Sequence, residues 1–198
     1  MEVKLHKRYP VAVDVERAWL VLRDIRAVSG CMPGAELTEQ LSANHYKGTV
    51  KVKVGPANAS FGGDVEVIET DTAARRIRLN AKGADKGGSS ASMDLTASVE
   101  PGENGQSVLV GSASVVVNGK FAQFGGRLMG QVSDMILAQF AGNFAAAAAA
   151  LPPPATGGAG AQAQPSAASA KPSELNALAL LWGLIKGWFA GLFGKRAS

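Results

Sequence analysis

Very few residues of this 198-residue sequence have side chains suited to chemistry at a metal ion or a reactive bond. His6 and His45 are the only imidazoles and Cys31 is the only thiol, and their positions do not give the short spacings of a zinc site. The sequence has no G-x-S-x-G nucleophile motif. It also has no P-loop, since the glycines at 157–160 lie in a Pro- and Ala-rich segment. It therefore predicts no catalytic residue and no metal site.

Two single residues leave an alternative open. Asp24 could act as a lone base, although a carboxylate on a helix surface is the commoner case. Cys31 could be a reactive thiol, but nothing nearby in the sequence would lower its pKa, which favours a packed thiol. A single cysteine excludes an internal disulfide and suits a reducing compartment.

The chain is organised around a long helix predicted over residues 121–151. Its large apolar side chains recur at gaps of three and four residues, which is the spacing of one stripe along an α-helix. No proline interrupts this segment before Pro152, and only Arg127 and Asp134 carry charge within it. Most of the helix surface is therefore expected to contact apolar partners. The stripe consists of Phe121, Phe124, Leu128, Val132, Met135, Ile136, Phe140 and Phe144.

The residues before this helix predict two short helices and seven strands. A helix is expected from Val15, with Asp14 as N-cap and Glu16 in its first turn, and a second helix or turn follows to Gly30. Residues 49–54 alternate valine with polar residues, which indicates a strand with one covered face. Short connections favour an antiparallel sheet, so we predict an α+β fold whose curved seven-stranded sheet wraps the long helix. The expected strands are 2–13, 36–41, 46–54, 59–69, 75–82, 90–100 and 107–117.

Composition divides the chain into a folded domain over 1–151, a linker over 152–173 and a tail over 174–198. The domain carries 16 Lys/Arg and 15 Asp/Glu, a net charge of +1, which argues against a nucleic-acid partner. The linker is rich in Pro, Gly, Ala and Ser, with Lys171 as its only charge, and is expected to be a flexible tether. No apolar segment follows the charged residues at positions 1–8, whereas a secretory signal would have one.

The tail is predicted to form an amphipathic helix that lies on a membrane surface. A spanning helix is long enough, at about 20 residues, but it would bury Lys186 and carry Lys195 and Arg196 across the bilayer. An interfacial helix avoids both costs, because Lys186 can snorkel and the basic end meets anionic lipid. A helix buried against the domain is a third alternative. The residues expected to contact the membrane are Leu178, Leu181, Trp182, Ile185, Lys186, Trp188, Phe189, Leu192, Phe193, Lys195 and Arg196.

Several short motifs, taken together and in this order, resemble the G subunit family of carbon monoxide dehydrogenase. The resemblance covers about residues 2–145. Met32 departs from the isoleucine expected in the pattern, which is a conservative difference. The motifs are Ala18-Trp19, C-M-P-G-A at 31–35, V-K-V-G-P at 52–56, F-G-G at 61–63, Asp71, Gly83, and Gly119 followed by Phe124, Gly125, Arg127 and Leu128.

The resemblance implies the START-like (SRPBCC) helix-grip fold, which usually encloses an apolar ligand cavity beneath the long helix. It also implies a partner, because members of this family accompany molybdenum hydroxylases, carbon monoxide dehydrogenase above all. They place that enzyme at the membrane, have a C-terminal anchor, and are not the catalytic subunits. The chain is therefore expected to be a non-enzymatic, peripheral protein on the cytoplasmic face of the cytoplasmic membrane, in contact with the hydroxylase and with membrane lipid.

A soluble oxidase of carbon monoxide must pass electrons to a quinone whose isoprenoid tail is insoluble in water. A tethered cavity protein could shield that tail, so menaquinone or ubiquinone is the expected ligand, with no covalent cofactor. Gly83, Gly87 and Gly88 are expected to form either a gate to the cavity or only a turn. The residues expected to line the cavity, each equally suited to core packing, are Trp19, Met32, Phe61, Met93, Phe124, Leu128, Met129, Val132, Met135, Ile136 and Phe140.

Three functions are open from the sequence. The first is a lipophilic carrier or recruiter without chemistry, and the second is a membrane adaptor whose cavity is empty or collapsed. The third is an enzyme of the same fold, such as a cyclase or hydrolase, in which Asp24 or Arg127 would be needed for turnover. The scarcity of His, Tyr and acidic residues in the long helix disfavours the enzyme, and the carrier is preferred over the adaptor.

Overall fold

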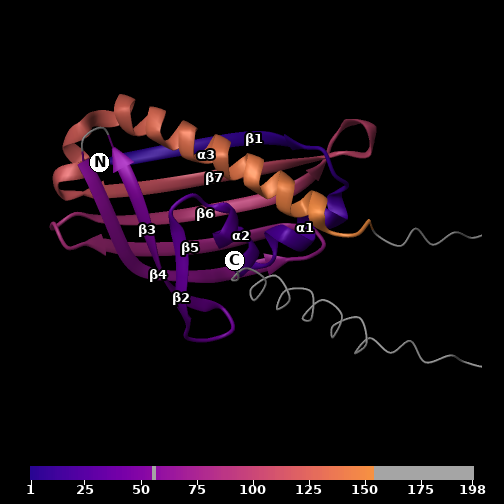
Figure 1. Ribbon diagram of the computed structural model, residues 1–198, viewed down its shortest axis with the longest axis horizontal. Helices are drawn as coiled ribbons and strands as arrows, with labels where there is room; N and C mark the ends of the chain where they lie inside the picture. Colours follow the sequence, from indigo (N-terminus) through magenta and orange to yellow (C-terminus); the bar gives the residue numbers. More distant parts are fainter. Residues whose placement is uncertain (55–56, 154–198) are drawn as a thin grey trace, which may run out of the picture. The chain divides into compact units, whose positions relative to one another are not determined.

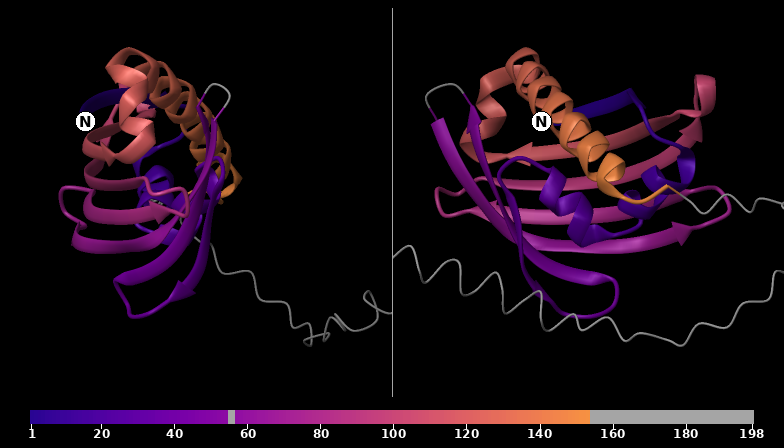
Figure 2. Two further views of the ribbon diagram at one scale, coloured as in Figure 1. Left: turned by 90° about the vertical axis from the view of Figure 1, so that its left-hand side faces the viewer. Right: turned by 45° about the vertical axis from the view of Figure 1, so that its right-hand side comes forward.

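The computed structural model describes residues 1–54 and 57–153 and confirms the predicted α+β helix-grip architecture (Figure 1). Seven antiparallel strands form one open, curved sheet. Two short helices follow the first strand, and a long helix after the last strand runs obliquely across the sheet (Figures 1 and 2). The turned views show that the sheet bends, so that β3 and β4 rise toward the start of the long helix (Figure 2).

The strand order β1-β7-β6-β5-β4-β3-β2 brings the first strand of the chain beside the last. β1 and β7 pair along their lengths, from Glu2 opposite Val116 to Val11 opposite Ser107. The other neighbours in the sheet are consecutive strands, as short connections require. The strands are β1 (Glu2–Val11), β2 (Ala35–Gln40), β3 (His45–Val54), β4 (Ala57–Asp71), β5 (Arg76–Asp85), β6 (Ser90–Pro101) and β7 (Ser107–Asn118).

Helices α1 (Val15–Leu22) and α2 (Ile25–Cys31) each follow an aspartate N-cap, Asp14 and Asp24. The Asp14 carboxylate accepts a hydrogen bond from the backbone N–H of Arg17 at 3.0 Å, and Asp24 accepts one from the backbone N–H of Arg26 at 2.9 Å. These carboxylates satisfy N–H groups that have no partner within the first helical turn. Asp24 therefore caps a helix, in line with the expectation of a helix-surface carboxylate for this residue.

Replacing Asp14 with alanine is expected to lower the free energy of unfolding by about 1 kcal/mol at neutral pH, because the N-cap is lost. The Arg17 N–H lowers the pKa of Asp14 below its usual value. This stabilisation is therefore present above the unfolded-state pKa and is lost as the pH falls through the lower folded-state value. Urea unfolding of both proteins should show the difference shrinking below about pH 4. A difference that stays constant in acid would contradict this role.

The long helix α3 spans Gly125–Ala150 and begins later than the predicted start at residue 121. The residues before it form a 3-10 turn, η2 (Gly119–Phe124). Gly125 has a φ of +76°, a left-handed conformation that separates η2 from α3 and that glycine adopts readily. The prediction of a single long helix is thus wrong at its start, because a three-residue spacing of Phe121 and Phe124 fits a 3-10 turn as well as an α-helix.

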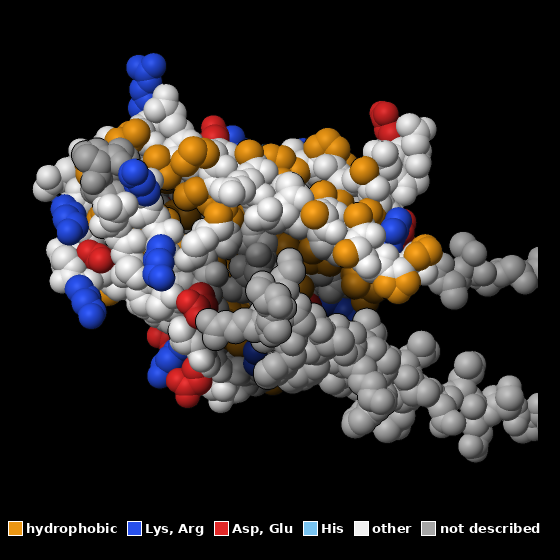
Figure 3. Space-filling model, in the orientation of Figure 1, with side chains coloured by type: hydrophobic (Ala, Val, Ile, Leu, Met, Phe, Trp, Pro, Cys, Tyr) orange, Lys and Arg blue, Asp and Glu red, His pale blue; other side chains and the backbone are white. Residues whose placement is uncertain are grey.

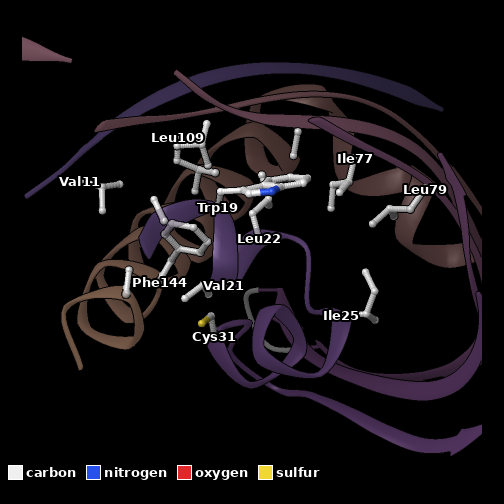
Figure 4. Close-up of a cluster of buried hydrophobic side chains, with 14 of the residues drawn as sticks. Val11, Trp19, Val21, Leu22, Ile25, Cys31, Ile77, Leu79, Leu109 and Phe144 are labelled. Atoms are coloured by element: carbon white, nitrogen blue, oxygen red, sulfur yellow. The ribbon is translucent and has the colours of Figure 1, made fainter. Parts of the chain in front are cut away.

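A main core lies between α1, α2, the second half of α3 and the concave face of the sheet (Figure 4). Phe144 is fully buried, and the side chains of Trp19 and Ile77 are 3 % and 1 % exposed. In Figure 4 the Trp19 indole lies between Leu109 and Ile77, at the centre of the labelled side chains. This core fixes the two short helices and the end of α3 on the sheet.

A second apolar cluster lies where η2 and the start of α3 meet β3, β4 and β7. We refer to it as the η2 cluster. It is smaller than the main core, and most of its members are only partly buried. Its buried members are Ala59, Val117 and Phe121, and its partly buried members are Val52, Phe61, Val115, Phe124, Leu128, Met129 and Val132.

The linker from residue 154 onward and the expected membrane helix at 174–198 lie outside the described residues. Their predicted roles therefore stay predictions. Within residues 1–54 and 57–153, no helix combines the length and the apolar character needed to cross a membrane.

Candidate functional site

The structure divides the eleven residues predicted to line a cavity into three groups. Five belong to the η2 cluster: Phe61, Phe124, Leu128, Met129 and Val132. Three belong to the main core or pack against it: Trp19, Met93 and Phe140. The remaining three belong to neither cluster: Met32, Met135 and Ile136. Met135 is 63 % exposed. The η2 cluster therefore holds the largest of the three groups, five of the eleven residues.

Phe121 is the centre of the η2 cluster and is only 1 % exposed. Its ring contacts Phe61 nearly edge-on at a centroid distance of 5.9 Å, and it lies 5.7 Å from the Phe124 ring. Tilted and edge-on arrangements of this kind are the favourable ones for aromatic pairs. The three rings therefore pack together at the junction of β4, η2 and α3.

The predicted lining misses half of this cluster. Phe121 belongs to the predicted apolar stripe but is not among the residues predicted to line the site. In β3 and β7, valines recur two positions apart, and this two-residue period could have identified them as inward-facing. The missed members are Val52, Ala59, Val115, Val117 and Phe121.

The first half of α3 is less well covered than the second half. Leu128 and Val132 pack against the η2 cluster but are only half-buried. On the facing sheet, Val50 lies opposite Phe61 and is 37 % exposed. The buried residues of α3 all lie in its second half, at Ala141, Phe144 and Ala148. Apolar surface near the η2 cluster thus stays partly uncovered, and an apolar molecule that covered it would gain about 25 cal/mol for each Å² removed from water.

Asp85 holds the β5–β6 turn against its neighbours at this end of the sheet. Its carboxylate accepts hydrogen bonds from the backbone N–H of Gly87 at 2.8 Å and of Ser60 at 3.3 Å. The Lys120 ammonium of η2 lies 3.8 Å away. The Gly87 N–H is the largest of the interactions that lower the pKa of Asp85. One carboxylate therefore links β4, the β5–β6 turn and η2.

The glycines predicted as a gate or a turn occupy different positions. Gly83 lies inside β5, whereas Gly87 and Gly88 lie in the β5–β6 turn. Gly119 at the start of η2 has a φ of +79°, and a side chain there would lie 2.7 Å from the Gly88 carbonyl oxygen. The turn and η2 thus approach each other more closely than a side chain allows. Gly87 and Gly88 thus form a turn, whereas the prediction of a turn is wrong for Gly83, which is a strand residue; a gating motion stays a prediction.

Two small pockets lie elsewhere on the described part of the chain. One, of about 200 Å³, lies over β4, β5 and β6, and the other, of about 120 Å³, lies beside α2, β2 and β3. Both are smaller than the roughly 300–1,000 Å³ of typical small-molecule sites. None of the eleven predicted lining residues contributes to either pocket.

The two histidines make separate contacts. His6 Nδ1 lies 2.8 Å from Ser112 Oγ, and His45 Nε2 lies 3.0 Å from Asp64 Oδ1. Over residues 1–54 and 57–153, no three His, Cys, Asp or Glu side chains gather in a geometry suited to a metal ion. Cys31 is 3 % exposed, and its burial raises the pKa of the thiol. These surroundings match the packed thiol that the sequence favours.

A thiol reagent is expected to leave Cys31 unmodified in the native chain and to react with it in denaturant. Burial and a raised pKa both reduce the thiolate available at the surface, so native labelling should be slower by on the order of 100-fold or more. The rate of labelling in buffer and in urea measures this difference. Rapid native labelling would mean that α2 opens locally and would contradict the packed state.

The fold is similar to several solved structures. A conserved protein from Geobacillus kaustophilus matches with a TM-score of 0.67 and 20 % identity, over 74 % of this chain and 95 % of that one. An aromatase/cyclase from Streptomyces sp. R1128 matches with a TM-score of 0.54 and 12 % identity, over 75 % and 94 %. A protein from Thermus thermophilus matches with a TM-score of 0.52 and 13 % identity, over 76 % and 98 %. At these identities the likeness is one of fold alone.

A comparison with curated protein sequences gives no match. The sequence profile of the family described as the G subunit of carbon monoxide dehydrogenase (CoxG) matches residues 8–149. This stretch runs from within β1 to the last turn of α3 and contains the whole η2 cluster. It confirms the resemblance predicted from the short motifs. The chain therefore belongs to the CoxG family, the G subunits of carbon monoxide dehydrogenase.

Proposed function

We propose that this chain is a non-catalytic accessory protein that binds a respiratory quinone and links a molybdenum hydroxylase of the carbon monoxide dehydrogenase type to the cytoplasmic membrane. Family membership indicates the accessory role with a carbon monoxide dehydrogenase. The quinone, menaquinone or ubiquinone, and the membrane link are the proposed parts. The observation that supports a ligand is the partly covered apolar side of α3, at Leu128 and Val132, beside the η2 cluster.

The chemistry of the η2 cluster suits a hydrocarbon tail. Its apolar members are side chains of the kind that contact a hydrocarbon chain. Met129 has a flexible thioether that adapts to an irregular chain. Isoprenoid units that covered Leu128, Met129 and Val132 would be removed from water together with these side chains. A quinone tail has this character.

One buried polar group in the main core also favours a ligand with a carbonyl. Nε1 of Trp19 is buried and has no hydrogen-bond acceptor among the described residues. A buried donor without a partner costs about 1–3 kcal/mol, so such groups are uncommon in folded proteins. In this proposal the isoprenoid tail lies on the η2 cluster and a carbonyl oxygen of the head group reaches into the main core to accept a hydrogen bond from Trp19 Nε1.

The membrane link is proposed for the tail at 174–198, which lies outside the described residues. Its support is the amphipathic pattern, the tryptophans at 182 and 188, and the basic end at Lys195 and Arg196. Deleting the tail should move the protein from the membrane fraction to the supernatant. A truncated protein that still sediments with membranes after a carbonate wash would contradict this role.

A membrane adaptor without ligand is the second candidate. It is favoured by the small volumes of the two pockets, about 200 and 120 Å³, neither of which lies beneath α3. In this case the η2 cluster would be a surface for protein contact only. The likeness to the aromatase/cyclase from Streptomyces sp. R1128, at 12 % identity, shows the fold alone.

Carriage is tested by titrating a short-chain quinone into the full-length protein with Trp182→Phe and Trp188→Phe. Trp19 is then the only indole of the chain, and its emission reports a quinone bound nearby. If the chain carries quinone, quenching of the Trp19 emission should saturate at one quinone per protein. Quenching that rises only linearly, as for free collisions, would favour the adaptor.

A matched pair of leucine variants locates the binding site. Leu128→Ala removes half-buried apolar surface beside the η2 cluster, so it should weaken quinone binding about 5- to 30-fold. Leu41→Ala truncates a leucine that is 43 % exposed outside both clusters, and its affinity should be unchanged. Equal affinities for the two variants would place the ligand away from α3.

A further inference from the structure

The charges of the domain are distributed unevenly. Residues at the end that contains η2 and the start of α3 carry a set of cations, which we call the basic rim. Asp85 and Asp64 are the carboxylates among them, Asp64 lying opposite Lys82 in the β4–β5 ladder, and Glu2 pairs with Lys4 at 3.9 Å near the same end. Apart from the rim cations, Lys4 and these three carboxylates, residues 1–151 carry nine Lys/Arg and twelve Asp/Glu, so one end is positive and the remainder is negative. The basic rim consists of Lys51, Lys53, Lys82, Lys86, Lys120 and Arg127.

The register of the sheet places the strand residues of the rim beside the η2 cluster. Lys53 pairs with Asn58 next to the β3–β4 turn, on the strand that supplies Val52 to the cluster. Lys86 follows β5 directly after Asp85, whose partner across the ladder is Phe61. Both lysines are exposed. The ends of β3 and β5 therefore carry exposed lysines close in sequence to residues of the η2 cluster or to their ladder partners.

The remaining side of the rim comes from η2 and α3. Lys120 Nζ lies 5.7 Å from the centroid of the Phe121 ring, at the centre of the cluster. Arg127 is exposed in the first turn of α3, which contains no acidic residue. Figure 3 shows Lys and Arg side chains gathered at the end where α3 begins, next to apolar side chains along that helix. The rim thus borders partly exposed apolar surface.

The cations of the rim are less neutralised than those elsewhere. Among the described residues, Lys120 is the rim member within 4.0 Å of a carboxylate, at 3.8 Å from Asp85. Away from the rim, short pairs are common: Lys7 lies 2.8 Å from Asp134 and Arg8 lies 2.8 Å from Glu100. Concentrated and uncompensated positive charge favours binding to an anionic surface.

We infer that the η2 end is a second membrane-contact surface, which docks on anionic lipid with the basic rim at the phosphates and the η2 cluster toward the acyl chains. This inference rests on the proposed function in that the chain works at a membrane. It adds a defined orientation of the domain at the bilayer. With this end against the bilayer, an apolar ligand enters beside α3 without crossing water.

The chemistry of the surface fits lipid better than a folded acidic partner. Uncompensated lysines around partly exposed apolar residues form the pattern of interfacial membrane binders. Each Lys or Arg close to an anionic membrane strengthens binding about fivefold, and the effect weakens with added salt. An acidic face of the enzyme is the other surface that could attract these charges, and the experiment separates the two.

The test places one polarity-sensitive fluorophore on the full-length chain at either of two glutamines. Gln123→Cys labels η2 beside the cluster, and Gln106→Cys labels the β6–β7 turn at the other end of the strands. Both glutamines are exposed, and Cys31 is buried, so labelling is selective. The probe surfaces are vesicles of phosphatidylcholine alone and of phosphatidylcholine mixed with phosphatidylglycerol.

Docking predicts a blue shift of the Gln123→Cys label on the mixed vesicles, little shift on phosphatidylcholine, and no shift of the Gln106→Cys label on either. The double variant Lys86→Glu/Arg127→Glu should abolish the shift. A control, Arg23→Glu/Arg26→Glu, reverses two exposed arginines outside the rim and should retain it. Equal responses of the two labels, or a Gln123→Cys label that responds only to added carbon monoxide dehydrogenase, would overturn the proposal.

Quinone quenching of Trp19, measured on the same unlabelled variants with Trp182→Phe and Trp188→Phe added, separates this inference from quinone binding. A chain that binds quinone while its Gln123→Cys label ignores anionic vesicles retains the proposed carrier function and contradicts docking. A chain whose label responds as expected but that binds no quinone supports docking and contradicts carriage.

Discussion

Replacing Phe144 with alanine is expected to lower the free energy of unfolding by about 3–5 kcal/mol. The Phe144 ring is fully buried in the main core, 6.0 Å from the Phe140 ring. Its removal leaves a cavity between α3 and the two short helices, where the surrounding elements are too well fixed to close it. Urea-induced unfolding, followed by far-UV circular dichroism, measures the change.

Phe124→Ala is the matched control because it removes the same side chain from the other end of the fold. Phe124 is half-buried in the η2 cluster, so the loss should be only about 1–2 kcal/mol. The carrier proposal adds that this variant should bind quinone more weakly. If both variants lost the same stability, the second half of α3 would not be the principal attachment of the helix to the sheet.

Gly63→Ala is expected to destabilise the domain by about 3 kcal/mol, the upper end of the usual cost of overpacking. Gly63 lies opposite Gly83 in the β4–β5 ladder. A Cβ at position 63 would overlap the carbonyl oxygen of Lys82 and lie 2.6 Å from the Gly83 Cα. Both obstacles are backbone atoms, so the two strands would have to separate. Thermal and urea unfolding measure this loss.

The neighbouring glycine provides the control for this prediction. A Cβ at Gly62 would meet no atom within 4 Å, so Gly62→Ala should be neutral or stabilising by up to about 1 kcal/mol. Both variants add one methyl group to the same strand, and they differ only in the space available. Equal stabilities for Gly62→Ala and Gly63→Ala would show that β4 and β5 do not approach as closely as described.

Local signals in the sequence are sufficient to predict most of the fold. The alternation of valine with polar residues in β3 reflects a sheet covered on one face, and the seven predicted segments correspond to the seven strands. Asp14 and Asp24 precede helices because their carboxylates compensate free N–H groups, a requirement confined to one turn of chain. Interactions between near neighbours in sequence are the ones that composition and spacing reveal.

Features that depend on tertiary packing are not predictable in the same way. The break at Gly125 follows from a left-handed φ, whereas the apolar spacing of Phe121 and Phe124 continues through it. Trp19 and Leu128 share an apolar character but lie in different clusters, because α1 packs against the second half of α3. The net charge of +1 also does not reveal the basic rim, because the fold brings its members together from β3, β5, η2 and α3.

The central claim, that this member of the CoxG family carries a quinone, is tested most directly by what it holds when taken from cells. The full-length protein would be purified from membranes in mild detergent, extracted with organic solvent and analysed by mass spectrometry. The account predicts a menaquinone or ubiquinone at close to one per protein, reduced in Phe124→Ala and retained in Ile68→Ala, which truncates a 47 % exposed side chain outside both clusters. A protein that contains no quinone and takes up none when it is added would contradict carriage and leave the adaptor.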